Sequence, residues 1–210
     1  MTRTTLHTSS HRTVATALTG IALALAAACG TSSSGSQLAG GSPSASTRTQ
    51  VHNAADVAFA SDMIPHHAQA VEMADLALAT ATDAQVRSLA TAIKGAQDPE
   101  IATMTGWLKE WGSPVPATGS AHMGGSGHGG MTMTGMMSED EMASLEHATG
   151  ADFDRMWVEM MTRHHEGAVA MARTEVGSGQ SGDAKALAQR IITGQSAEIA
   201  TMASIAKRLG

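Results

Sequence analysis

Cysteine, aromatic residues and runs of basic charge are all scarce in this 210-residue chain. A single cysteine excludes any disulfide within the chain, and aromatics make up only 2% of it, with no tyrosine. There is no run of lysine or arginine and the formal net charge is −6 at pH 7, which argues against nucleic acid as a partner. The apolar residues are mostly alanine, with 15 methionines, a composition that favours closely packed helices over sheets.

The first 29 residues have the pattern of a secretory signal. Arg3 and Arg12 lie in a polar start, and an apolar run follows from Val14 to Cys29. This run is short for a membrane-spanning helix. It ends in "LAAAC" before a glycine, which resembles a bacterial lipoprotein cleavage site where Cys29 becomes the lipidated first residue. The alternative is a plain signal with an incidental cysteine. Both interpretations predict export. The lipoprotein interpretation adds a lipid anchor at the outer face of the cytoplasmic membrane or in the cell envelope.

Two low-complexity stretches divide the remaining chain. Residues 30–50 are rich in Ser, Gly and Thr and are predicted to be a flexible tether, followed by one domain over 51–210. A second such stretch, 112–138, is predicted to be a flexible crossover inside that domain. The arms on either side are an internal repeat, because a shift of 98 residues, without a gap, aligns 56–109 with 154–207 at 18 of 54 identical positions. Features shared by both copies therefore need one common explanation.

Each copy is predicted to form two helices. In the first copy, apolar residues recur at spacings of three, four and seven between Phe59 and Ala77. A break follows, where Thr82 and Gln85 have the spacing of a capping box for a second helix that ends near Gly112.

The second copy is predicted to contain helices at about 139–176 and 183–209, separated by a Gly/Ser-rich turn. Pro65 and Pro99 are interpreted as kinks rather than helix ends, because the second copy has other residues at the equivalent positions. The predicted fold is therefore all-α: a four-helix bundle of two duplicated hairpins, joined by a long Gly/Met/His-rich crossover.

The first helix of each copy carries a stripe of candidate metal ligands. A methionine, a histidine, an alanine and another methionine follow at spacings of three, four and three, which places them on one face. A second histidine lies about 100° to the side and still reaches that face. The predicted ligands are Met63, His66, His67 and Met73 in the first copy and Met161, His164, His165 and Met171 in the second. Imidazole and thioether together favour a soft ion: Cu(I), Cu(II) through the histidines, or silver.

The second helix of each copy carries an inward-facing polar stripe of glutamine, glutamate and methionine. The members are Gln97, Glu100 and Met104 in the first copy and Gln195, Glu198 and Met202 in the second. A carboxylate on an apolar face is costly unless it is paired, and the histidines of the neighbouring helix or a metal would pair it. We interpret the glutamates and methionines as secondary ligands or partners of the ligands, and the glutamines as hydrogen-bonding groups within the bundle.

The crossover is unusually rich in the same two residue types. A segment without a core has no packing use for methionine, whereas clustered thioethers on a mobile chain suit Cu(I). These secondary candidates are His122, Met123, His128, Met131, Met133, Met136 and Met137.

Each pattern also has an interpretation without a metal. A methionine stripe at helical spacing fills a core, and buried histidines and glutamates can pair with one another in a polar network. On that interpretation the chain is a structural or interaction module.

The motifs of several enzyme classes are absent from the sequence. There is no Glu-x-x-His pair for a di-iron bundle, no Cys-x-x-Cys-His for haem attachment and no His-Glu-x-x-His for zinc hydrolysis. No phosphate-binding loop or nucleophile stands out either, so we predict no catalysis and no organic cofactor. A redox enzyme that uses the same metal would need an open coordination position, which a sequence does not reveal.

The segments "DVAFASDMIPHHAQAVEMA" and "FDRMWVEMMTRHHEGAVAMA", each followed by a "Q-x-x-E-I-x-x-M" helix, resemble the CopM-like copper-binding family, domain of unknown function 305. The similarity spans about Asp56 to Leu209. The resemblance implies a ferritin-like helical bundle, exported or lipid-anchored, with copper binding and copper tolerance in some members. It implicates the same eight histidines and methionines of the doubled motif.

These observations lead to one hypothesis. The chain is expected to be an exported, lipid-anchored copper-binding protein that sequesters or transfers the ion, with Cu(I) preferred over Cu(II). Its expected partners are the metal ion, the membrane through Cys29, and a protein that donates or accepts copper.

Overall fold

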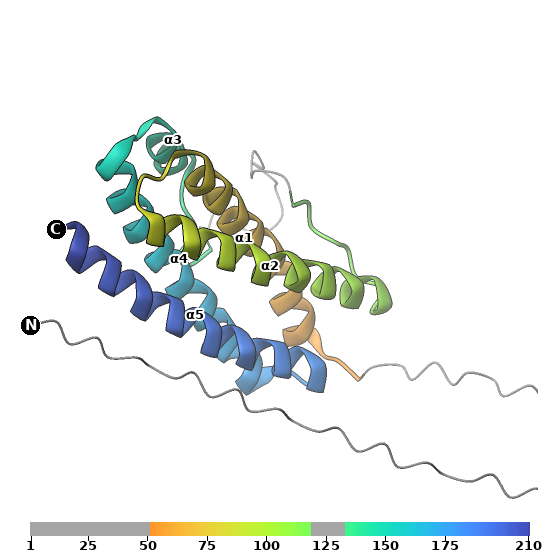
Figure 1. The fold of residues 1–210 in the computed structure, drawn as a ribbon. Helices are drawn as coiled ribbons and strands as arrows, with labels where there is room; N and C mark the ends of the chain where they lie inside the picture. The colour runs from red at the N-terminus through yellow and green to blue at the C-terminus, as the bar shows by residue number, and fades with distance from the viewer. Residues whose placement is uncertain (1–50, 119–132) are drawn as a thin grey trace, which may run out of the picture. The chain divides into compact units, whose positions relative to one another are not determined.

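The computed structural model describes residues 51–118 and 133–210, and this part of the chain is helical without any strand (Figure 1). The prediction of an all-α bundle is confirmed. The helices are α1 (Ala54–Thr80), α2 (Ala84–Glu110), α3 (Glu139–His147), α4 (Gly150–Ser178) and α5 (Gly182–Leu209). None of the described helices is long and apolar enough to cross a bilayer. The predicted signal, tether and lipidated cysteine lie outside the described residues, as do four crossover candidates: His122, Met123, His128 and Met131.

The long helices form two hairpins, α1 with α2 and α4 with α5, which pack together mainly through α1 and α4. In Figure 1 the first hairpin runs from orange to green and the second from teal to blue. Pro65 and Pro99 both lie inside helices, as predicted. The core consists of two apolar clusters, which we name after their tryptophans: the Trp157 cluster and the Trp107 cluster.

Two predicted helix boundaries are wrong. The helix expected over 139–176 is two helices, because Ala148 and Thr149 adopt extended backbone and Gly150 has a φ of 59°. The cap of α2 is Asp83, whose carboxylate accepts from the N–H groups of the next residues, and not Thr82 with Gln85. The Thr82 hydroxyl instead donates to Asp154 on α4.

Two buried aspartates at equivalent positions of the repeat fasten each hairpin turn to the other copy. Asp154 accepts from the N–H groups of Thr82 and Asp83 at 3.1 and 3.0 Å and from the Thr82 hydroxyl at 2.5 Å. Asp56 accepts from the N–H groups of Gln180 and Ser181, the latter at 2.9 Å. Because each copy closes the turn of the other, neither hairpin is complete alone.

A second buried carboxyl lies beside Asp56. Glu175 is 1% exposed, and neither of its carboxyl oxygens has a hydrogen-bond donor among the described residues. Burial, and then the neighbouring Asp56, raise the pKa of Glu175 to about 7. Burial also opposes ionisation of Asp56, but its hydrogen bonds, led by the Asn53 N–H, outweigh that effect and lower its pKa. The protonated Glu175 therefore supplies an O–H donor toward the Asp56 carboxylate.

This carboxyl pair predicts a pH dependence of stability. Glu175 keeps its proton up to about pH 7 in the folded chain but loses it near its ordinary pKa of 4.5 when unfolded. The folded state thus binds more protons between these values, so the contribution of Glu175 to the free energy of unfolding falls as the pH rises through that window. We expect the free energy of unfolding of Glu175→Gln, taken relative to the wild type, to increase as the pH rises from 4.5 to 7. Urea unfolding at several pH values measures this difference.

The difference between variant and wild type isolates Glu175 from the buried histidines, whose lowered pKa values act in the opposite direction. Glu166→Gln, an exposed position on the same helix, is the matched control and should show no such trend. A constant difference for Glu175→Gln across the window would contradict the assignment.

Candidate metal centre

Two histidines from different copies meet where α1 packs on α4. The ring centroids of His66 and His164 lie 3.8 Å apart with the rings tilted by 42°, and both side chains are fully buried. Each belongs to the stripe predicted for its helix, so the fold joins the stripes of the two copies.

The second histidine of each pair is held by a glutamate of the neighbouring helix. The distance from His67 Nε2 to Glu100 Oε2 is 2.8 Å, and the distance from His165 Nε2 to Glu198 Oε2 is also 2.8 Å. Both histidines are fully buried, whereas each glutamate side chain is 20% exposed. His67 and His165 lie about 100° from the main stripe and so face a flank of their helix. They are nevertheless buried, because the other helix of the same hairpin covers that flank in both copies.

Many polar atoms of this region have no hydrogen-bond partner among the described residues. They include five imidazole nitrogens: Nδ1 of His66, His67 and His165, and both ring nitrogens of His164. The glutamines differ from the prediction, because both side-chain polar atoms of Gln97 and the carbonyl oxygen of Gln195 also lack partners. Buried polar atoms are nearly always satisfied, since leaving one unpaired costs about 1–3 kcal/mol. The unpaired imidazole nitrogens are therefore candidate ligands of a metal ion.

The electrostatics keep the central pair neutral. Burial, followed by the neighbouring His67, lowers the pKa of His66 to about 3. Burial, followed by His66, places the pKa of His164 well below its ordinary value. Both rings are therefore uncharged at neutral pH, and each offers a nitrogen lone pair.

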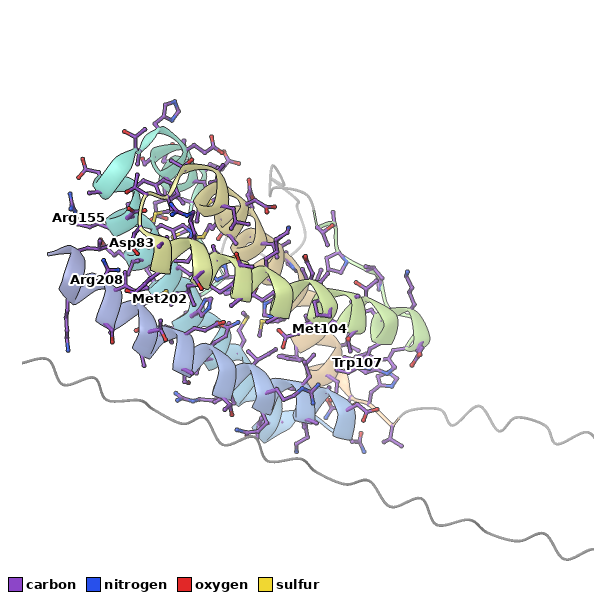
Figure 2. The ribbon with its side chains drawn as sticks, in the orientation of Figure 1. Asp83, Met104, Trp107, Arg155, Met202 and Arg208 are labelled. Carbon is purple, nitrogen blue, oxygen red and sulfur yellow. The ribbon has the colours of Figure 1, made fainter. Side chains whose placement is uncertain are left out.

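The candidate sulfur ligands divide symmetrically between the two apolar clusters. Met63 and Met104 belong to the Trp107 cluster, and the partly buried Met171 packs against it. Met73, Met161 and Met202, their equivalents in the repeat, belong to the Trp157 cluster. Figure 2 shows Met104 on α2 and Met202 on α5 at the inner side of the bundle. The thioethers are therefore available as two groups of three, each drawn from both copies.

Within the described residues, no three His, Cys, Asp or Glu side chains already converge as they would around a metal ion. A hard ion such as Ca²⁺ needs several oxygen ligands. A soft ion such as Cu(I) takes fewer ligands and accepts thioether sulfur, so the observed donor set of imidazole and methionine fits it.

The end of the predicted crossover packs on the bundle and reaches His66. Residues 133–137, here named the strap, pack against α1 and α4, and Met137 is buried. The Gln69 side chain donates to the Met137 carbonyl at 2.9 Å and accepts from the Met137 N–H at 2.7 Å. The Thr134 carbonyl oxygen lies 3.3 Å from His66 Nε2. Met133 and Met136 are half-buried, so with Met137 three of the crossover candidates lie in the strap.

Sequence reasoning missed the residues that seat the strap. Gly167 occupies the position in α4 that Gln69 occupies in α1, and a Cβ there would lie 2.0 Å from the Thr134 carbonyl oxygen. The aligned repeat held a signal for this contact, because a glycine stands in a helix interior where the other copy has a long side chain.

Gly167→Ala should push the strap off α4. Backbone atoms cannot yield as a side chain does, so we expect a loss of about 1–3 kcal/mol in the free energy of unfolding. Hydrogen exchange of the Met137 amide should accelerate. Gly194→Ala in α5 meets nothing within 4 Å and is the matched control, with an expected gain of about 0.5–1 kcal/mol. Equal behaviour of the two variants would show that the strap is not seated on Gly167.

The chain resembles several solved structures. A protein from Streptomyces coelicolor, described as a candidate secreted DUF305 protein, is 34% identical, with 74% of this chain and 94% of that chain covered at a TM-score of 0.65. A DUF305 fragment from Deinococcus radiodurans is 30% identical, with 74% and 97% covered and a TM-score of 0.64. CopM in its Cu(II)-bound form is 33% identical, with 74% and 97% covered and a TM-score of 0.62.

CopM also has structures in Cu(I)-bound, silver-bound and apo forms. None of the curated proteins compared with the chain matches it. The sequence model of the family described as "Domain of unknown function (DUF305)" matches residues 56–206, which include both copies of the repeat and all four buried histidines. The chain belongs to the DUF305 family.

Proposed function

We propose that this protein binds copper outside the cytoplasm and limits its toxicity by sequestering the ion or transferring it to a partner. The observation that carries the proposal is the group of four fully buried histidines, whose rings keep five nitrogens without a hydrogen-bond partner among the described residues. Burying so many unsatisfied imidazole nitrogens costs free energy in the metal-free protein, and binding an ion offsets that cost.

The ligand chemistry favours Cu(I). Neutral imidazole and thioether suit the reduced ion, whereas Cu(II) would depend on the histidines alone. CopM, which is 30–33% identical to this chain, has structures with Cu(I), Cu(II) and silver bound, which supports a copper-family ion without selecting one oxidation state.

The setting we propose is extracytoplasmic, with the protein anchored by lipid at Cys29. The signal-like first 29 residues support export, as does the description of the Streptomyces coelicolor relative. Binding rather than catalysis is proposed, because none of the enzyme motifs considered occurs in the sequence.

A second function class is a helical module whose histidines and glutamates only satisfy one another. The contacts of His67 with Glu100 and of His165 with Glu198 favour it. His66 and His164 weigh against it, because a self-satisfied network would not leave both nitrogens of His164 without a partner.

Copper titration separates the two functions. The full chain with Cys29→Ser, which removes a competing thiol, would be unfolded thermally with and without Cu(I) under anaerobic conditions. A ligand of the folded state raises the free energy of unfolding by about 2.7 kcal/mol at a free concentration of 100 Kd. The module predicts no change. A quadruple alanine variant of His66, His67, His164 and His165 is the control and should lose the shift.

A further inference from the structure

We propose that Glu100 and Glu198 are positioning residues that hold His67 and His165 as Nε2–H tautomers, so that Nδ1 is the atom of each ring that binds the ion. This inference rests on the proposed copper function and names the ligand atoms and the residues that select them.

The two outer histidines, His67 and His165, each hydrogen-bond to a glutamate through Nε2. An ionised carboxylate has acceptor oxygens only, so the ring nitrogen that lies 2.8 Å from it must be the donor. In a neutral imidazole the other nitrogen then carries the lone pair. In both rings that nitrogen is Nδ1, which is buried and has no partner among the described residues. A second proton on the ring would bury an N–H group without an acceptor, which is costly.

The same logic extends to one member of the central pair. A main-chain carbonyl is also only an acceptor, and the Thr134 carbonyl oxygen lies 3.3 Å from His66 Nε2. His66 Nδ1 is unpaired like the other two. His164 is different, because neither of its ring nitrogens has a hydrogen-bond partner among the described residues. Three rings thus present Nδ1, and the inference assigns no tautomer to His164.

The arrangement recurs in both copies despite different surroundings. The residues just before the glutamates are Asp98 and Pro99 in α2 but Ser196 and Ala197 in α5. The nitrogen–oxygen distance and the 20% exposure of the glutamate are nevertheless the same. A hydrogen bond from the nitrogen that does not bind metal is the usual way in which proteins orient a histidine ligand, and its loss typically costs 10–100-fold in metal affinity.

The test uses the full chain with Cys29→Ser, labelled with nitrogen-15 in histidine. In the apo protein, long-range proton–nitrogen NMR spectra should show His67 and His165 as Nε2–H tautomers. With silver-109 added as a probe for the soft ion, scalar coupling should appear on Nδ1 of these rings. An Nδ1–H tautomer, or coupling to Nε2, would overturn the inference while leaving the copper function intact. Absence of silver from every ring would overturn both.

Variants at the glutamates supply the second arm. Glu100→Ala with Glu198→Ala removes both acceptors and should mix the tautomers and weaken Cu(I) binding by about 10–100-fold. Glu100→Gln with Glu198→Gln keeps an acceptor oxygen and should retain the tautomer and most of the affinity. Glu166→Ala removes the same charge from an exposed position next to His165 and is the control. A double alanine variant with unchanged tautomers and affinity would overturn the positioning role.

Discussion

Replacing both His66 and His164 by leucine should lower the affinity for Cu(I) by more than about 100-fold, because loss of an outer partner alone costs 10–100-fold. The same variant should leave the apo protein at least as stable as the wild type. Its buried leucines remove three nitrogens that have no partner, and replacing unsatisfied polar groups by apolar ones of similar volume is neutral or stabilising. Affinity is measured by competition with a Cu(I) chelator and stability by urea unfolding.

The opposite signs of the two effects make this variant informative. If the histidines served only the core, leucine would cost stability and leave copper affinity unchanged. His147→Leu is the control, because His147 is exposed on α3 and its ring hydrogen-bonds to the Ala143 carbonyl of its own helix. It should alter neither quantity.

The second large effect is expected at Asp154. Asp154→Ala leaves the N–H groups of Thr82 and Asp83 without their acceptor inside the bundle. Hydrogen bonds to charged groups contribute about 1.5–3 kcal/mol each, and three such bonds are lost with the Asp154 carboxylate, so we expect a loss of about 3 kcal/mol or more. Urea unfolding at pH 7 measures it.

Asp152→Ala tests whether the loss reflects the turn rather than charge. Asp152 lies two residues away with a side chain that is 79% exposed, and its partner is the exposed Arg155 on the same helix. Surface pairs of this kind contribute about 0–1 kcal/mol. A loss at Asp154 no larger than at Asp152 would contradict the interlocking of the two copies.

The repeat explains why much of the site could be predicted from the sequence. Met63 and His66 have the same spacing as Met161 and His164, and a helical period then places them on one inward face. A histidine of the neighbouring helix was one of the two partners expected for Glu100, with a metal as the other, because a carboxylate on an apolar face needs a partner. Prediction succeeded where one helix or one hairpin determined the contact.

The contacts that escaped prediction depend on the packing of distant segments. Asp56 and Asp154 are identical in the two copies, yet nothing local indicates that each closes the opposite turn. The strap was not predicted because a Gly/Met-rich composition suggests a mobile chain, and its contacts come from residues of two helices, among them Gln69 of α1 and Gly167 of α4. The break before α4 depends on the backbone of Ala148 and Thr149, neither of which is a strong helix breaker.

The position of the ion in the bundle is the central claim and is tested most directly by diffraction. Crystals of the full chain with Cys29→Ser, loaded with Cu(I) and measured at the copper absorption edge, would locate the ion by its anomalous signal. The account predicts density between α1 and α4, next to the imidazoles of His66 and His164 and within reach of methionine sulfur. Density found only along residues 119–137, with the four histidines unchanged from the apo protein, would contradict it.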